Sequence, residues 1–415
     1  MPPLERNGKI VILASAFRSL DYGFLSIFLG VYLSLLGFSV FEAGLIFSAI
    51  MAGGALSNLI STYKGDRIGR KRMLVCMSTL MVAGGLLYPL ASNLTLFIFI
   101  SLFAMTTSTG GDRTAFLSLD MAILSQLSEN QHRTMIFSIY NLVGMAGKSL
   151  GALLILAPVL FQSWLYMEEV SSFKAVFAIY SLIAFSGIVI YSRLSPAAEL
   201  IKSDLHQEVG TAQEESRHII YRLAILSSID AFGGGFMIRS FISFWFAGRF
   251  GTTVDGIAGI FFAGQLLNMV SVWVSAPVAR KIGLIKTMVY TQIISNLLLG
   301  VMALAGNFWI CICLYLLREL SNDMDVPTRQ SYMMAIVPEK SRTKTAGMTN
   351  LARTVAQTVS PTIGGILANL TFLGMPFLIG SGIKLVYNGA LFLMFRDINA
   401  PEEIPRVKPN IDTNN

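Results

Sequence analysis

Acidic and basic side chains recur inside the long apolar runs of this 415-residue chain, and they are the groups best able to do chemistry. On insertion scales, a charged side chain at the centre of a membrane helix costs about 2.5–3.5 kcal/mol, so such residues need a wet or protein-lined interior. Most of them fall in four runs, at about residues 10–36, 96–125, 218–247 and 309–337. This concentration predicts a polar pathway between those segments.

The candidate residues for a pathway that carries a solute or a proton are Arg18, Asp21, Asp112, Arg113, Asp230, Asp325 and Arg329. Asp21 and Asp230 lie about 11 to 12 residues inside their runs, hence roughly 16 Å deep at 1.5 Å per residue. We expect them to be the leading sites of protonation, because a buried carboxyl group changes its proton affinity with its surroundings. The alternative is a static ion pair that only locks helices together, and the sequence leaves both open.

Helical spacing predicts which of these charges can pair. Arg18 and Asp21 are three residues apart and can pair on one face, and Asp325 and Arg329 can do so at a spacing of four. Adjacent residues point about 100° apart, so Asp112 and its neighbour Arg113 each need a partner on another helix. Arginines of the pathway either bind an anionic solute or neutralise its acids, and the sequence does not decide between these roles.

The elements that position these charges are membrane helices. Hydrophobic residues make up 54% of the chain and charged residues 13%, with a mean hydropathy of +0.64. These values exclude a disordered chain, a coiled coil and a disulfide scaffold. The remaining runs cover about residues 42–63, 73–91, 134–158, 173–193, 254–279, 286–305, 344–370 and 373–395. With the four above they predict twelve transmembrane helices, because each run is long enough to cross the hydrocarbon core.

Loop charges predict the orientation and the division of the chain. Basic residues such as Lys64 and Arg72 gather in one set of loops, whereas the opposite set holds Lys174 and Arg249. By the positive-inside rule, the first set and both termini face the cytoplasm, with the plasma membrane as the expected location. The ranges we expect are a six-helix bundle over 1–194, a cytoplasmic linker over 195–217, a second six-helix bundle over 218–397 and a cytoplasmic tail over 398–415.

An internal repeat supports two pseudo-symmetric bundles. Ile68-Gly69 matches Ile282-Gly283, Asp21 matches Asp230, and Met121-Ala122-Ile123-Leu124 matches Met334-Ala335-Ile336-Val337. The matches keep their order at an offset near 210 residues. Two related halves around a central pathway are a recurrent plan of transporters, in which rocking of the halves exposes a midplane site to each side in turn.

The segment Gly65-Asp66-Arg67-Ile68-Gly69-Arg70-Lys71-Arg72 resembles the signature loop of the major facilitator superfamily. The resemblance implies the fold of that family, with twelve transmembrane helices in two six-helix bundles. It also implies a cytoplasmic gating loop, whose candidate residues are Asp66, Arg67, Gly69, Arg70 and Lys71. The segment Ser360-Pro361-Thr362-Ile363-Gly364-Gly365 resembles an element of the family's antiporters, which favours export.

The expected function is therefore that of a secondary active transporter, which moves a small solute by alternating access with a proton as the coupling ion. Efflux is favoured, and a proton- or sodium-coupled uptake permease is the alternative. A non-transporting membrane sensor is a further alternative, although the chain lacks a large soluble domain. We expect no enzyme activity, cofactor, metal site or nucleic-acid partner, since no nucleotide-binding, catalytic or metal-ligand motif is present. The expected surroundings are a lipid bilayer, and the expected state is a monomer.

Overall fold

The computed structural model describes residues 6–111, 114–127, 133–199, 214–326, 329 and 342–395, and these contain helices without a strand. Nine helical segments of this described part are long and apolar enough to cross a membrane. The other expected crossings, at 96–125, 309–337 and 344–370, contain a break, a short helix or many polar residues, respectively. The all-α membrane fold is confirmed.

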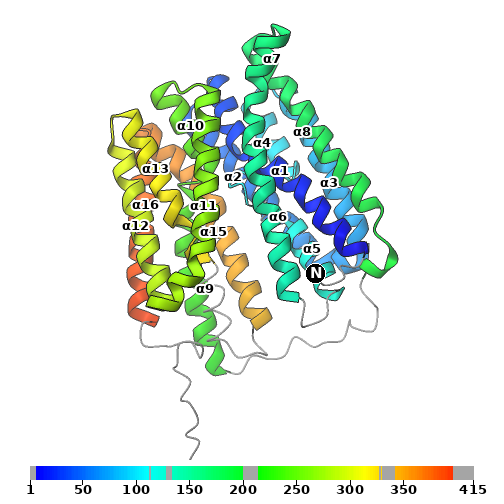
Figure 1. Cartoon of the computed structure of the whole chain (residues 1–415), viewed down its shortest axis with the longest axis vertical. Helices are drawn as coiled ribbons and strands as arrows, with labels where there is room; N and C mark the ends of the chain where they lie inside the picture. Colours follow the sequence, from blue (N-terminus) through cyan, green and yellow to red (C-terminus); the bar gives the residue numbers. More distant parts are fainter. Residues whose placement is uncertain are drawn as a thin grey trace, which may run out of the picture.

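Helices of the first half of the chain lie on the right of Figure 1, in blue to green. They are α1 (Arg6–Leu35), α2 (Val40–Ile68), α3 (Arg70–Leu87), α4 (Leu94–Phe103), α5 (Ala115–Gln126), α6 (Arg133–Leu153), α7 (Ala157–Leu165) and α8 (Glu169–Ser192). Three short 3-10 turns accompany them, η1 (Tyr88–Leu90), η2 (Leu154–Leu156) and η3 (Pro196–Ala198).

Helices of the second half lie on the left of the same view, in green to red (Figure 1). They are α9 (Glu214–Gly235), α10 (Arg239–Phe250), α11 (Val254–Ile282), α12 (Leu284–Leu304), α13 (Phe308–Asn322), α15 (Arg342–Leu370) and α16 (Met375–Phe395). Residues 330–341, which belong to the run predicted over 309–337, lie outside the described residues.

The run predicted as one helix over 96–125 is broken, which corrects the sequence-based expectation. α4 ends at Phe103, α5 begins at Ala115, and the described residues between them are not helical. The hydroxyl group of Thr107 donates to the carbonyl oxygen of Gly111 at 2.9 Å. Hydroxyl side chains that bond to nearby backbone in this way compete with the helix ladder, and Gly110 adopts a positive φ of 74°.

The second half contains a similar interruption. The segment predicted over 218–247 divides into α9, which ends at Gly235, and α10, which begins at Arg239. Three consecutive glycines, Gly233 to Gly235, occupy the last turn of α9, where the high conformational entropy of glycine disfavours a continuous helix. α13 likewise ends at Asn322, well before the predicted limit of its run.

The signature segment is not a loop of several residues. α2 continues to Ile68 and α3 begins at Arg70, so Gly69 alone forms the turn, with φ at 100°. The repeat predicts the same turn in the second half, where Gly283 joins α11 to α12 with φ at 92°. Both positions require a glycine because other residues strain at such φ values.

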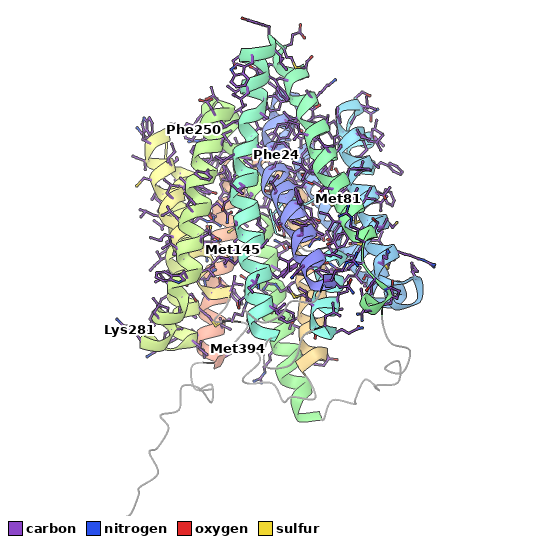
Figure 2. The ribbon with its side chains drawn as sticks, turned by 45° about the vertical axis from the view of Figure 1, so that its right-hand side comes forward. Phe24, Met81, Met145, Phe250, Lys281 and Met394 are labelled. Carbon is purple, nitrogen blue, oxygen red and sulfur yellow. The ribbon has the colours of Figure 1, made fainter. Side chains whose placement is uncertain are left out.

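The N-terminal end of α1 lies at the lower end of the molecule in Figure 1. Figure 2 places Lys281, at the end of α11, and Met394, at the end of α16, at this same lower end. Phe250, at the end of α10, lies at the upper end. α11, which follows Phe250 and ends beside Lys281, therefore runs from the upper end of the molecule to the lower end.

Helices of the two halves meet in the upper part of the molecule, where α1 packs against α10 and α2 against α15. The Ser243 hydroxyl group donates to the carbonyl oxygen of Ile27 at 2.9 Å. The hydroxyl groups of Ser48 and Thr362 are 2.8 Å apart. A Cβ atom at Gly30 would collide with Ser240 and Ser243, so this contact requires glycine. The upper contact thus combines neutral hydrogen bonds, close packing of small residues and apolar contacts such as that between the rings of Phe47 and Phe241.

Candidate functional site

A cavity of about 510 Å³ lies between the two halves, below this upper contact. Polar and charged groups supply much of its lining. They come from α1 and α6 of the first half and from α9, α10, α11, α12, α13, α15 and α16 of the second. Met145, labelled in Figure 2, contributes to the lining from α6. Ligand cavities in proteins span roughly 300–1,000 Å³, so this volume suits a small organic molecule.

Asp230 on α9 is the centre of a cluster of three basic side chains in the cavity wall. Its Oδ2 atom is 2.8 Å from Nη1 of Arg353 on α15 and 3.0 Å from Nη1 of Arg329. Its Oδ1 atom is 3.4 Å from Nζ of Lys384 on α16. We refer to Asp230 and these three basic residues as the Asp230 cluster. A carboxylate with three cations around it is held in its charged form by Coulomb attraction.

Asp325 joins this cluster from the segment that follows α13. Its Oδ2 atom is 3.2 Å from Nη1 of Arg329, which confirms the pairing predicted at a spacing of four residues. Its Oδ1 atom accepts a hydrogen bond of 2.7 Å from Nε2 of Gln292 on α12. Asp230, Asp325 and Arg329 are thus brought together in one wall of the cavity, as the pathway hypothesis requires.

Further charges line the same cavity. Arg318 pairs with its neighbour Glu319 at the lower part of α13, and both side chains are buried. Asp323 accepts a hydrogen bond of 2.7 Å from the side chain of Asn322. Arg239, at the start of α10, and Lys148, on α6, complete the charged lining among the described residues.

Arg18 does not pair with Asp21, which corrects the prediction from helical spacing. Its guanidinium group instead donates to Oδ2 of Asp120 on α5 at 2.7 Å and lies 4.6 Å from the centre of the Phe116 ring. Tyr140 on α6 and Tyr191 on α8 also donate to the Asp120 carboxylate, at 3.0 and 3.1 Å. These hydrogen bonds from other helices satisfy both charges, which a bond to Asp21 alone would not.

Asp21 lies away from the cavity, which corrects the expectation that it faces the same space as Asp230. Its side chain is fully buried, and neither carboxyl oxygen has a hydrogen-bond partner among the described residues. A void of about 10 Å³ lies beside it, lined also by Arg18 and Tyr191. That volume is about the size of one water molecule. Tyr140, which donates to Asp120, also contributes to the lining of the central cavity.

The proposed gating residues meet the end of α8 and of α5 at the lower end of the first half. Glu199 accepts hydrogen bonds from the backbone N–H groups of Arg70 and Lys71, at 2.6 and 3.2 Å. Nη1 of Arg70 donates to Gln126 at 2.7 Å, and Nζ of Lys71 donates to the carbonyl oxygen of Leu194 at 2.8 Å. Gly69 therefore directs the start of α3 onto a carboxylate cap.

The structure does not place every predicted residue. Asp112 and Arg113 lie outside the described residues, and the side chains of Asp66 and Arg67 are likewise not described, although both positions belong to α2.

Sequence reasoning also missed partners that local spacing does not reveal. Glu199 lies in the segment predicted to be a linker, and Gln292 and Lys384 lie within apolar runs. For Lys384, the rarity of a lysine in a membrane helix was a usable signal of function.

Each ion pair between described residues lies within one half of the chain. The Arg18–Asp120 pair joins helices of the first half, and the pairs of the Asp230 cluster and of Arg318 join segments of the second. The charges therefore hold each half together, whereas neutral groups join the halves in the upper part.

A polytopic helical membrane protein with a charged cavity between its halves has the architecture of a membrane carrier. The sequence matches the Major Facilitator Superfamily over residues 11–360, and the chain belongs to this family of transporters.

Two kinds of relative accompany that match. The chain is 26% identical over 427 residues to the uncharacterized membrane protein YJR124C of Saccharomyces cerevisiae, and the match covers 95% of each. Its fold is similar to that of the nucleoside transporter NupG, with a TM-score of 0.72, 12% identity, and coverage of 94% of this chain and 100% of the other. A D-xylose–proton symporter gives a TM-score of 0.72, 14% identity and coverage of 92% and 97%. At these identities the structural neighbours establish the fold.

Proposed function

We propose that this protein is a secondary active transporter that binds a small solute in the central cavity and moves it by alternating access. The observation that carries the proposal is the cavity itself. It holds about 510 Å³ between the two halves and is lined by charged residues from both, as expected of a carrier whose solute site lies between two related halves.

The distribution of contacts supports a rocking movement of residues 1–194 against residues 218–397. A rotation that separates the upper ends of α1 and α10 would break neutral hydrogen bonds such as that from Ser243 to Ile27. Such bonds contribute only about 0.5–1.5 kcal/mol each. The buried ion pairs would stay intact, because each of the described ones lies within one half. The movement is therefore energetically accessible.

We propose Asp21 as the residue that carries the coupling proton. Its carboxyl group is fully buried without a hydrogen-bond partner, so an ionised form here would be a buried and uncompensated charge. The neutral acid suits this environment. Rearrangement of the helices, with water entering through the void shared with Arg18 and Tyr191, would favour release of the proton. Asp230 differs, because three cations compensate its charge.

Orientation and direction complete the proposal. The end of the molecule that carries the start of α1 and Lys281 faces the cytoplasm. The protein lies in the plasma membrane and works as a monomer. Export is the direction that the Ser360–Gly365 resemblance favours. The carbonyl oxygen of Pro361 in that segment packs closely against Gly44, so packing alone could also explain the element. Uptake with a proton or sodium ion is therefore the second direction.

The test is transport by the purified protein in liposomes, with a solute chosen by thermal stabilisation from a chemically broad panel. We expect a pH gradient to drive accumulation of the solute, and expect Asp21→Asn to abolish that dependence while solute exchange at equal pH continues. Absence of solute movement under every gradient would refute the carrier function. Unchanged proton dependence in Asp21→Asn would refute the role of Asp21 only.

A further inference from the structure

We infer that the transported solute is an organic anion, which binds with its negatively charged group against Arg353 and Lys384 of the Asp230 cluster. The inference rests on the proposed carrier function and adds the chemical class of the solute. It starts from the charges that line the cavity.

The described lining of the cavity has an excess of positive charge. Its basic residues are Lys148, Arg239, Arg318, Arg329, Arg353 and Lys384. Its acidic residues are Asp230, Glu319, Asp323 and Asp325. Six bases against four acids leave an excess of two positive charges in a space walled by helices. Because water screens charges poorly in such a space, an anion gains more there than it would at the protein surface.

The Asp230 cluster concentrates this excess. Two carboxylates, of Asp230 and Asp325, face the three cations Arg329, Arg353 and Lys384. Arg329 lies between both acids, at 3.0 Å and 3.2 Å, so it is shared by them. Arg353 and Lys384 contact Asp230 alone among the described acids, and both contribute to the cavity lining. One more negative charge would balance the cluster.

The geometry of the two basic residues suits an anionic group. A guanidinium group carries five N–H donors, and Arg353 directs Nη1 to a single carboxylate oxygen. Its remaining donors can bind a carboxylate or phosphate in the planar, bidentate manner typical of arginine. The ammonium group of Lys384 lies 3.4 Å from Oδ1 of Asp230, a longer separation that leaves room for a second acceptor.

The same arrangement disfavours a cationic solute. Oδ2 of Asp230 already faces two guanidinium groups, and Oδ1 faces Lys384. Oδ1 of Asp325 is bonded to Gln292, and its Oδ2 to Arg329. An incoming cation would therefore find the carboxylates of Asp230 and Asp325 already paired, and the basic side chains of the cluster would repel it.

The opposite wall of the cavity accommodates the rest of the molecule. Ser15 and Ser19 on α1 and Asn141 on α6 provide neutral polar groups, and Leu117 and Met145 provide apolar surface. Lys148 on α6 is the charged residue of the first half in the described lining. We therefore assign the anionic group to the Asp230 cluster, and an uncharged polar or apolar body to the neutral lining of the first half. A solute that contacts both halves in this way would link its binding to their relative movement.

The experiment compares matched acids and amides as ligands of the purified full-length protein. The panel contains succinate, glutarate, benzoate, phthalate, citrate and phenyl phosphate, and the neutral amide or alcohol of each. Thermal unfolding in detergent measures binding, and transport in liposomes follows for every compound that binds. We expect stabilisation by acids and not by their neutral partners, and loss of affinity by about 10- to 100-fold in Arg353→Gln and in Lys384→Gln. The charge-preserving Arg353→Lys should retain more affinity than Arg353→Gln.

Asp230→Asn separates the two charge classes. It removes a negative charge from the cluster, so an anion should bind this variant at least as tightly as the wild type, whereas a cation would lose its partner. Because the single substitution disturbs a buried cluster, its binding is measured on protein that still unfolds in one cooperative thermal transition.

Equal stabilisation by acids and amides, loss of acid binding in cooperatively folded Asp230→Asn, or a panel without any stabilising acid would overturn the inference. Transport of a neutral or cationic compound, unaffected by Arg353→Gln, would overturn it too and leave the carrier function standing. Failure of every compound to move would instead refute the carrier function.

Discussion

Arg353 on α15 donates to Oδ2 of Asp230 on α9 at 2.8 Å, and the same oxygen faces Arg329 at 3.0 Å. A single carboxylate oxygen thus links two helices and the segment that follows α13. Lys384 on α16 approaches the other oxygen. Asp230 is consequently the residue on which the charge balance of the second half depends most.

We predict that Asp230→Asn destabilises the protein by about 3–5 kcal/mol, because it leaves three largely buried cations without their shared counter-ion. The measurement is thermal or denaturant unfolding in detergent. Asp230→Asn/Arg353→Gln should recover part of this loss, since it removes one of the unpaired cations. A single variant as stable as the wild type would contradict the compensation of charge described above.

A second prediction contrasts two acids of the first half. Asp120→Asn should destabilise strongly, because Arg18 would lose its buried carboxylate partner and a single acceptor oxygen would remain for two tyrosines. Asp21→Asn should leave stability within about 0.5 kcal/mol, since no described group bonds to its carboxyl oxygens. The same unfolding measurement tests both. Similar losses in the two variants would show that Asp21 has a partner in the folded protein.

Two ion pairs show where sequence reasoning succeeds and where it does not. The Asp325–Arg329 pair was predictable, because both residues lie in one short segment and their separation follows from local geometry. The same rule failed for Arg18, because Asp120, 102 residues away in sequence, is a better partner than Asp21. Spacing along a helix identifies possible pairs but does not reveal competing partners on other helices.

Most of the fold was predictable because the membrane dictates long apolar helices, and the limits of most helices agree with the apolar runs. The break between α4 and α5 was also visible in principle, in the segment Thr106-Thr107-Ser108-Thr109-Gly110-Gly111. The Asp230 cluster was not, because it requires α9, α15 and α16 to come together in space.

A third prediction concerns the upper contact between the halves. Cysteines introduced as Ser48→Cys and Thr362→Cys should form a disulfide under mild oxidation, because the two hydroxyl groups are 2.8 Å apart. The cross-link should abolish transport in liposomes, and reduction should restore it. The exposed Cys76 and Cys313 are first replaced by alanine, and each single cysteine variant serves as a control. Full transport by the cross-linked protein would show that the upper ends of α2 and α15 do not separate.

A fourth prediction concerns the carboxylate cap on α3. Glu199→Ala should destabilise the protein by about 1–2 kcal/mol, because the first N–H groups of α3 would lose their acceptor. Glu199→Gln retains one acceptor oxygen and should lose less. Glu169→Ala, at the start of α8 in the same half, is the matched control and should stay within about 0.5 kcal/mol. The measurement is the midpoint of thermal or denaturant unfolding. A Glu199→Ala variant as stable as the wild type would show that the carboxylate does not stabilise the start of α3.

Both members of each ion pair between described residues lie in the same half of the chain. These pairs can therefore form even when the two halves are separate polypeptides. Two separately translated fragments, divided between residues 199 and 214, would each contain both members of every ion pair that the described residues form within that half. Co-expressed in one membrane, they should reassemble into a working carrier. In such a split protein, peptide continuity would serve mainly to keep the fragments at equal number and close together.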